Sequence, residues 1–252
     1  MLLLITKIYS TINKEEKLCG ILLDIKSAFD NICPKILQSI LDQINIPVQI
    51  KKFIYNLMTN RKIYFKVANK LEGPYFRSKG GPQGSVLSPL LYNIYVAGIA
   101  LIIDKLINIF QYADDTLLTC AARNIQEGIN RLEQCLRKVN EYLKSHKLPL
   151  SVNKTKFIIF TQTEFKSIEQ YQIEFDNVLI KPSRVIRYLG MYLDYKMTWQ
   201  DHFNFIIGKA TRLSNVIKCL RNTWWGGHPQ VLLNVYKCLI RSTIEYNLYL
   251  RK

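Results

Sequence analysis

The sequence contains no Cys-x-x-Cys pair, no internal repeat and no low-complexity tract. Because metal-binding cysteines usually come in such close pairs, a zinc knuckle is not expected. Scattered cysteines in a largely apolar chain are typical of reduced core residues in an intracellular protein. The six cysteines concerned are Cys19, Cys33, Cys120, Cys135, Cys219 and Cys238.

Long uninterrupted apolar runs are also absent. The run Met1–Ile5 meets Lys7 almost at once and is too short for the apolar region of a signal peptide. The stretch Val86–Ile103 is longer, but Ser88 and Pro89 interrupt it, which favours a buried helix over a membrane span. We therefore expect no membrane segment and no membrane partner.

Acidic residues are few. The 252 residues include 35 Lys and Arg against 19 Asp and Glu, a formal net charge of +16, which favours a polyanionic partner. A ribosomal or histone-like protein would share this charge, but such proteins do not usually have 12% aromatic and 48% hydrophobic residues. This composition favours a folded basic chain of one large or two modest domains.

Two of the few acids are adjacent. Asp114 and Asp115 lie between the apolar runs 109–112 and 116–119, so the pattern predicts a hairpin turn between short strands. Burying paired carboxylates is costly without a neutralising cation, and Mg²⁺ prefers such oxygen ligands. An ordinary turn is the alternative, because Asp is a favoured turn residue.

A third acid, Asp24, ends the apolar strand expected over 18–25. Phosphoryl transfer by two metals needs carboxylates from separate segments to hold ions about 3.5–4 Å apart. Asp24 and Asp114 suit this role if their strands are neighbours in one sheet, with Asp115 as the third acid. Asp30 is expected to be a turn or helix N-terminal residue instead of a ligand.

The remaining pattern alternates between helices and strands and predicts an α+β fold of split-βαβ order. Thr198 is the expected N-cap of an amphipathic helix that continues to Leu220. Gly190 interrupts the last expected strand. Further helices are expected over 34–42, 47–59, 86–105, 125–143 and 231–246, and further strands over 62–68, 75–78, 150–152, 156–161 and 185–194.

Five segments, in order, resemble the successive palm motifs of reverse transcriptases, and the likeness is closest to those of animal non-LTR retrotransposons. The segments are LLDIKSAFD, GGPQGSVLSPLLYNIYV, QYADDTLL, LSVNKTKFIIF and RYLGMYLD. The resemblance covers the chain from about Leu18 to its end. It implies a split-βαβ polymerase palm over residues 1–197 and a C-terminal helical thumb over residues 198–252, lying along a primer–template duplex.

The resemblance also implies an activity, that of an RNA-directed DNA polymerase, a nucleotidyltransferase. Asp24, Asp114 and Asp115 would hold two Mg²⁺ ions while a primer 3′-hydroxyl attacks the α-phosphate of a deoxynucleoside triphosphate. The implied partners are an RNA template and a DNA primer, and the implied location is the nucleus. Catalysis would rest on positioning and charge neutralisation.

Other residues receive roles through the same resemblance. Phe29 would be the steric gate against a ribose 2′-hydroxyl, with a core phenylalanine as the alternative. Gln83 and Gly84 would lie beneath the incoming nucleotide, with Tyr112 also at the substrate. Gly81 departs from the family, which usually has a small aliphatic residue there.

Basic residues and a turn complete the implied site. Lys154 would protonate the leaving pyrophosphate, with Lys156 as the alternative candidate and a solvated basic turn as the alternative for both. Lys209 and Arg212 would contact duplex phosphates without base specificity, unless that helix face is merely solvated. The implied primer grip consists of Tyr188, Leu189 and Gly190.

One part of the family pattern has no counterpart. Related enzymes carry fingers segments before the residue matched by Asp24, and those segments grip the triphosphate. We therefore expect a partial domain that binds primer–template but extends it poorly. A non-catalytic nucleic-acid-binding remnant is the alternative function. An RNA-dependent RNA polymerase is disfavoured, because Phe29 would clash with a ribonucleotide.

Overall fold

The computed structural model describes residues 1–59, 61–82, 84–221 and 226–248 and has the expected mixture of helices and strands. The first half contains α1 (Leu2–Ile12), β1 (Lys17–Asp24), α2 (Pro34–Gln43), α3 (Val48–Met58), β2 (Arg61–Val67), β3 (Lys70–Arg77), α4 (Leu87–Val96), α5 (Ile99–Ile102), β4 (Ile107–Tyr112) and β5 (Asp115–Ala122). The second half contains α6 (Ile125–Ser145), the 3₁₀ turn η1 (Val152–Lys154), β6 (Lys156–Phe160), α7 (Phe165–Ile168), β7 (Ile173–Phe175), β8 (Val178–Ile180), β9 (Val185–Tyr188), β10 (Met191–Asp194), α8 (Gln200–Leu220), α9 (Pro229–Val235), the π-helical segment η2 (Tyr236–Arg241) and α10 (Ser242–Leu248).

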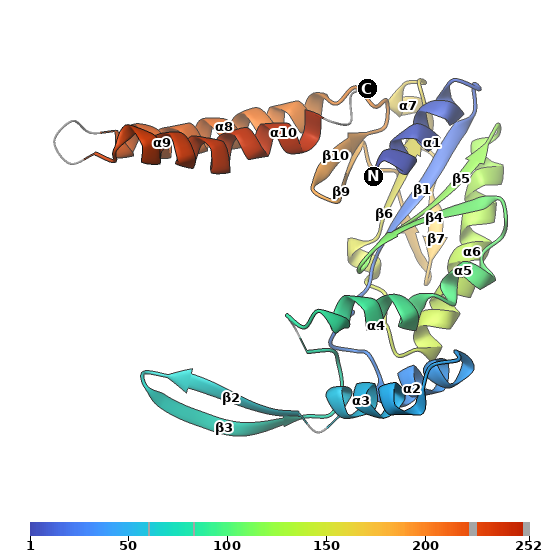
Figure 1. Ribbon diagram of the computed structural model, residues 1–252. Helices are drawn as coiled ribbons and strands as arrows, with labels where there is room; N and C mark the ends of the chain where they lie inside the picture. The colour runs from blue at the N-terminus through green and yellow to red at the C-terminus, as the bar shows by residue number, and fades with distance from the viewer. Residues whose placement is uncertain (60, 83, 222–225, 249–252) are drawn as a thin grey trace.

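A four-stranded antiparallel sheet organises the molecule, with strand order β4-β5-β1-β6 (Figure 1). Strand β1 pairs with β5 along its whole length, from Lys17 opposite Ala122 to Asp24 opposite Asp115. The other edge of β1 pairs with β6. Because side chains alternate along a strand, each face of this sheet carries its own apolar cluster.

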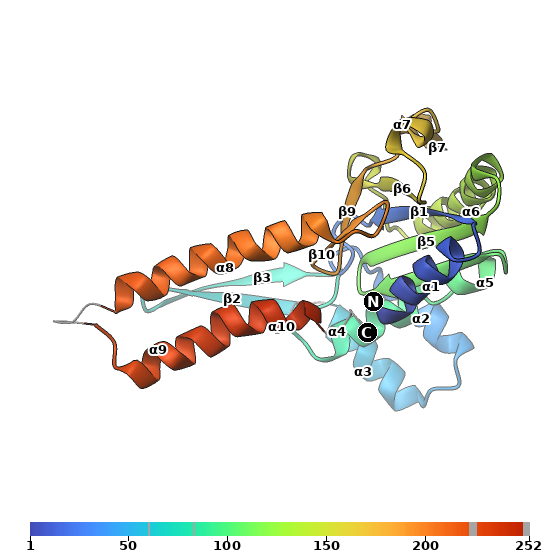
Figure 2. The ribbon, with the colours of Figure 1, turned by 90° about the horizontal axis from the view of Figure 1, so that it is seen from above.

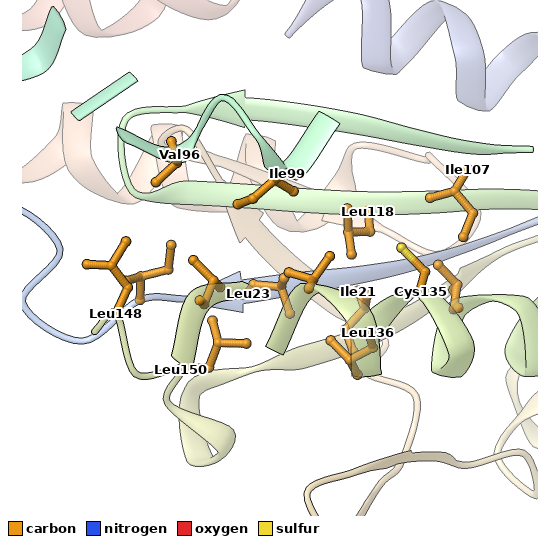
Figure 3. Packing of buried hydrophobic residues seen from close by; sticks show 14 of the residues in the cluster. Ile21, Leu23, Val96, Ile99, Ile107, Leu118, Cys135, Leu136, Leu148 and Leu150 are labelled. Carbon is orange, nitrogen blue, oxygen red and sulfur yellow. The ribbon is translucent and has the colours of Figure 1, made fainter. Parts of the chain in front are cut away.

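The larger cluster lies between one face of the sheet and helix α6 (Figure 3). Ile21 and Leu23 of β1 and Leu118 of β5 pack with Leu136, which belongs to the three- and four-residue repeat of α6. The Asn124 side chain caps this helix by accepting a hydrogen bond from the Gln126 amide at 3.0 Å. Each fully buried aliphatic side chain of this kind contributes about 1.5–3 kcal/mol.

The opposite face is covered by α1 and the β9–β10 hairpin. Leu18 and Leu117 of the sheet pack there with Leu4 and Ile8 of α1. The apolar pattern at the start of the chain predicted no helix. It forms one because Leu4, Ile5, Ile8 and Thr11 recur at helical spacing and are buried.

Two arms extend to the same side of the molecule, one from the end of α3 and one from β10 (Figures 1 and 2). The first is the β2–β3 ribbon, whose side chains are almost all exposed. The second, the C-terminal arm, consists of α8 together with α9, η2 and α10, which pack along it. The expected helix over 231–246 is present but begins at Pro229 and contains the π-helical segment.

The helix expected over 86–105 was wrong in extent. It ends at Val96, and α5 resumes at Ile99. The Tyr142 hydroxyl donates to the Tyr95 carbonyl at 3.2 Å, the group that a continuous helix would pair with the Ile99 amide. A Cβ at Gly98 would lie 2.6 Å from that hydroxyl oxygen, so only glycine permits this approach.

Two further expectations were wrong, and one hairpin was missed. Instead of a strand over 150–152, Leu150 makes only an isolated bridge to Ile25, and η1 follows. Cys219 and Cys238, expected as core residues, are exposed, because the described part of the C-terminal arm is only two helices thick. The hairpin β7–β8 was not predicted; its strands have three residues each, too few for a clear period. Within the described ranges no helix combines the length and hydropathy needed to cross a bilayer.

Candidate active site

Three carboxylates gather where β1 ends and β5 begins. Asp24 and Asp115 are Cα partners in adjacent antiparallel strands, so their side chains leave the same face. Asp114 lies in the two-residue turn that joins Tyr112 of β4 to Asp115. Its neighbour Ala113 has φ of +52°, a conformation that is costly for a residue with a Cβ and that is concentrated at functional sites. The turn therefore presents two acids beside a third.

A lysine lies next to these acids. Lys154 Nζ is 3.6 Å from Asp24 Oδ2, and both side chains are partly exposed. The backbone places the lysine there, because the Ser151 amide donates to the Asp24 carbonyl at 2.8 Å and the Lys154 amide donates to the Ser151 carbonyl at 3.2 Å. Lys156, two residues after Lys154, begins β6 and pairs with Leu22 instead of Asp24. The geometry thus brings Lys154 to the acids.

The donor set of this cluster is purely oxygen, which suits Mg²⁺ better than zinc or copper. The register places Asp24 and Asp115 side by side and Asp114 in the adjoining turn. Among the residues that the structure describes, no three His, Cys, Asp or Glu side chains already surround a common point. The residues therefore fit the ion by chemistry and by their position at one end of the sheet.

Replacing Asp115 with Asn is expected to stabilise the metal-free chain at neutral pH. Partial burial, then the charges of Asp114 and Asp24, raise the pKa of Asp115. A raised pKa in the folded state means that stability is complete below the unfolded pKa and falls as pH rises through the folded pKa. Much of the side chain still contacts water, which screens the repulsion, so the gain is about 0.5 kcal/mol. Urea unfolding should show this gain at pH 7 and none at pH 3; a stability loss at pH 7 would contradict it.

Phe29 and the glycine-rich loop lie together. The Phe29 ring is 4.9 Å from the ring of Tyr92, and the Gly81 amide donates to the Phe29 carbonyl at 2.8 Å. Gly80 has φ of +79°, and a Cβ there would lie 2.7 Å from the Asp30 carbonyl oxygen. Glycine is therefore required for the loop to pass so close to the segment that follows Asp24.

The structure gives fewer contacts for the other residues that the resemblance assigned to the substrate. Gln83 lies outside the described residues. Gly84 has φ of +82° and open space around it, and Tyr112 is 67% exposed. Asp30 lies in a turn, as expected, and forms an ion pair with Arg77 at 3.0 Å.

The predicted interruption at Gly190 is a tight turn between β9 and β10. Leu189 and Gly190 have φ of +47° and +80°, as a two-residue hairpin turn requires. Tyr188 is buried, and its hydroxyl donates to the Phe110 carbonyl at 3.0 Å. Burial, then the charge of Asp115, raises the pKa of Tyr188 to about 12. Tyr188 thus anchors the hairpin beside the acids, and its turn residues are the more exposed part.

One important residue, Asp194, was missed. Its carboxylate is buried and accepts hydrogen bonds from the amides of Lys196, Thr198 and Trp199 at 3.2, 2.9 and 2.8 Å. The expected N-cap at Thr198 was wrong in position, because Trp199, at φ of +66°, is the residue before α8. An aspartate shortly before an expected helix could have indicated this role, because Asp side chains often bond to nearby backbone amides. Asp194 was instead interpreted as the last residue of the segment RYLGMYLD.

Helix α8 carries the predicted basic positions. Lys209 and Arg212 are exposed on it. Its apolar stripe is buried less than expected: Ile206 is buried, whereas Leu220 is 39% exposed. The reason is that only the start of α8 meets the sheet side of the molecule, through β10. The exposed basic face can therefore approach a long polyanion.

The chain is similar to known proteins along most of its length. A sequence profile described as "Reverse transcriptase (RNA-dependent DNA polymerase)" matches residues 4–193. Among curated proteins, the "RNA-directed DNA polymerase from mobile element jockey" of Drosophila melanogaster is 24% identical over 248 residues, which cover 94% of this chain and 26% of that protein. The "Probable RNA-directed DNA polymerase from transposon BS" of the same species is 24% identical over 209 residues, covering 81% of this chain and 23% of that protein. The chain thus spans about a quarter of the length of these relatives.

Solved structures agree with this likeness at the level of fold. Apo telomerase from Candida tropicalis superposes with a TM-score of 0.56 at 11% identity, covering 99% of this chain and 45% of that chain. Telomerase from the same species in complex with a TWJ fragment of telomeric RNA gives a TM-score of 0.52 at 11% identity, covering 96% and 41%. The predicted likeness to reverse transcriptases of non-LTR retrotransposons is confirmed by the sequence relatives. Because the matching profile covers well over half of its residues, this chain belongs to the reverse transcriptase (RNA-dependent DNA polymerase) family.

Proposed function

We propose that this chain is the palm and thumb of an RNA-directed DNA polymerase that transfers deoxynucleotides to a primer 3′-hydroxyl. The observation that carries the proposal is the pairing of Asp24 with Asp115 across β1 and β5, with Asp114 in the adjoining turn. The sheet with its helices, residues 1–197, would form the split-βαβ palm. The C-terminal arm, residues 198–252, would form the thumb.

The acids and Lys154 divide the chemistry between them. Asp24, Asp114 and Asp115 would hold two Mg²⁺ ions, which supply charge neutralisation at the reacting phosphate. Lys154, 3.6 Å from Asp24, carries a proton that it can donate to the leaving pyrophosphate as a general acid. Until a substrate arrives, the same cation offsets part of the negative charge of the acids. Phe29, supported by Tyr92, would line the sugar position.

The nucleic acid would lie along the face that carries the β9–β10 turn. Tyr188 fixes that turn to β4, so Leu189 and Gly190 keep a defined position for holding a primer end near Asp115. Lys209 and Arg212 on the exposed face of α8 would contact duplex phosphates. The RNA template, DNA primer and deoxynucleoside triphosphates are thus the proposed partners.

Primer extension tests this function directly. Purified protein is given an RNA template with an annealed DNA primer, deoxynucleoside triphosphates and Mg²⁺, and extension is followed on a gel. Extension that stops when Mg²⁺ is chelated supports the polymerase. Tight duplex binding in the same buffer without extension would instead favour the alternative, a nucleic-acid-binding remnant whose basic surface persists without catalysis.

Replacing Phe29 with Ala is expected to relax sugar selection by about 100-fold or more. A bulky ring rejects the ribose 2′-hydroxyl by steric clash, and its removal opens that space. The ratio of kcat/KM for a deoxynucleotide to that for the matching ribonucleotide is the measurement. Phe65→Ala on the exposed β2–β3 ribbon is the matched control. Unchanged discrimination in Phe29→Ala would mean that Phe29 serves packing alone.

The double substitution Lys209→Ala and Arg212→Ala is expected to weaken duplex binding for all sequences alike. The slope of log K against log salt is negative, and each lost phosphate contact makes it less steep by about 1, so the double variant should have a slope shallower by about 2. The matched control is Arg137→Ala with Lys138→Ala, the same charge change at exposed positions of α6. An equal loss in both double variants would show a non-local charge effect and remove the assignment to α8.

A further inference from the structure

The hydroxyl group of Tyr92 in α4 is buried and unpaired in the described part of the chain. The residue is fully buried, and its hydroxyl oxygen has no hydrogen-bond partner within the described residues. Burying a polar group unpaired is costly, so such groups in native proteins call for an explanation. A phenylalanine would fill the same space without that cost.

The neighbouring Tyr95 shows that α4 does not impose this situation. Tyr95 is equally buried, yet its hydroxyl donates to the His146 carbonyl at 2.6 Å and accepts from the Cys33 amide at 3.3 Å. Two tyrosines on one helix thus differ in one respect: one hydroxyl is satisfied by the fold, and the other is not. This contrast supplies a matched control within the same helix.

The surroundings of Tyr92 point to the acids. Its ring packs 4.9 Å from Phe29, and the charge of Asp114, after burial, raises its pKa, so the hydroxyl keeps its proton. Thr116 follows Asp115 directly and is also buried with an unpartnered hydroxyl. By strand alternation Thr116 shares a face with Leu118, which packs in the same cluster as Tyr92. Two unpaired hydroxyls therefore accompany the acidic turn.

We propose that Tyr92 is a positioning residue for Asp114. Its hydroxyl donates a hydrogen bond to the Asp114 carboxylate, directly or through one water, once that carboxylate turns to hold a Mg²⁺ ion. The inference rests on the proposed function of the acids. In the structure the three carboxylates do not surround a common point. A rotation of the Asp114 side chain that brought them around an ion would also give the unpaired Tyr92 hydroxyl a hydrogen-bond partner. The Tyr92 ring, separately, supports Phe29.

Mn²⁺ binding followed by electron paramagnetic resonance tests the inference without requiring polymerase activity. Tyr92→Phe keeps the ring and removes the hydroxyl, and we expect Mn²⁺ affinity to fall about tenfold, the worth of one hydrogen bond to a charged group. Tyr95→Phe should keep wild-type Mn²⁺ affinity. In thermal unfolding without metal, the variant that is impaired should be the other one. Tyr92→Phe should be at least as stable as wild type, and Tyr95→Phe should be less stable.

The outcomes separate the inference from the proposed function. Wild-type binding that is lost in Asp114→Asn but unchanged in Tyr92→Phe would overturn only the role of Tyr92. A Tyr92→Phe chain that loses as much metal-free stability as Tyr95→Phe would also overturn it, because the hydroxyl would then have a partner in the resting fold. Mn²⁺ binding that Asp114→Asn leaves intact would remove the metal site itself and both proposals with it.

Discussion

Replacing Asp114 with Asn is expected to lower RNA-templated primer extension by at least about 1,000-fold, since groups that stabilise transition-state charge contribute on that scale. Asn has nearly the same shape as Asp but no negative charge to hold a cation. After burial, the charge of Asp114 raises the pKa of Asp115 and that of Tyr92, so Asp114 interacts electrostatically with both groups. The rate of single-nucleotide addition at saturating Mg²⁺ is the measurement.

A second readout protects this prediction from a folding defect. Mg²⁺ should raise the Tm of the wild-type chain, because a ligand that binds only the folded state stabilises it. Asp114→Asn should fold normally and lose that rise. Asp176→Asn is the control, since Asp176 pairs with Lys144 at 3.3 Å on an exposed surface. Extension by Asp114→Asn within tenfold of wild type would contradict the assignment of a metal ligand.

Replacing Asp194 with Ala is expected to cost about 3 kcal/mol of unfolding free energy, because hydrogen bonds to a charged acceptor are worth roughly 1.5–3 kcal/mol each and water replaces part of them. The buried Asp194 carboxylate satisfies three backbone amides at the junction between β10 and α8. Without it, those amides lose their partner and the start of α8 loses its fixed direction. Urea unfolding measures the cost.

The same substitution should weaken binding of a primer–template duplex, since the direction of the C-terminal arm depends on that junction. Asp201→Ala is the matched control: Asp201 is an exposed acid in the first turn of α8 and should cost about 0.5 kcal/mol through the helix dipole. Asp194→Asn keeps one acceptor oxygen and should fall between them. A loss below about 1 kcal/mol in Asp194→Ala would show that other contacts hold the arm.

Features that depend on neighbouring residues were predictable from the sequence. The apolar repeat of α6 and the strand that ends at Asp24 follow from local periodicity, and both are present. The turn at Gly190 follows from the freedom of glycine at positive φ. The order of the five motifs was enough to predict the family, because each motif is a short contiguous string of the chain. The acids Asp114 and Asp115 belong to this predictable part.

Only the tertiary structure decided how distant groups are paired. Whether a buried hydroxyl has a partner separates Tyr92 from Tyr95, yet both occupy similar positions in an apolar helix. Lys154, and not Lys156, lies beside Asp24 because the amide of Ser151, just before η1, donates a hydrogen bond to the carbonyl of Asp24 at the end of β1. Helix α1 was not predicted, and what holds it against the C-terminal half includes a distant contact: its Tyr9 hydroxyl accepts a hydrogen bond from Trp199, 190 residues later, at 2.9 Å. Such contacts join segments that are far apart in the chain, so local propensity carries no signal for them.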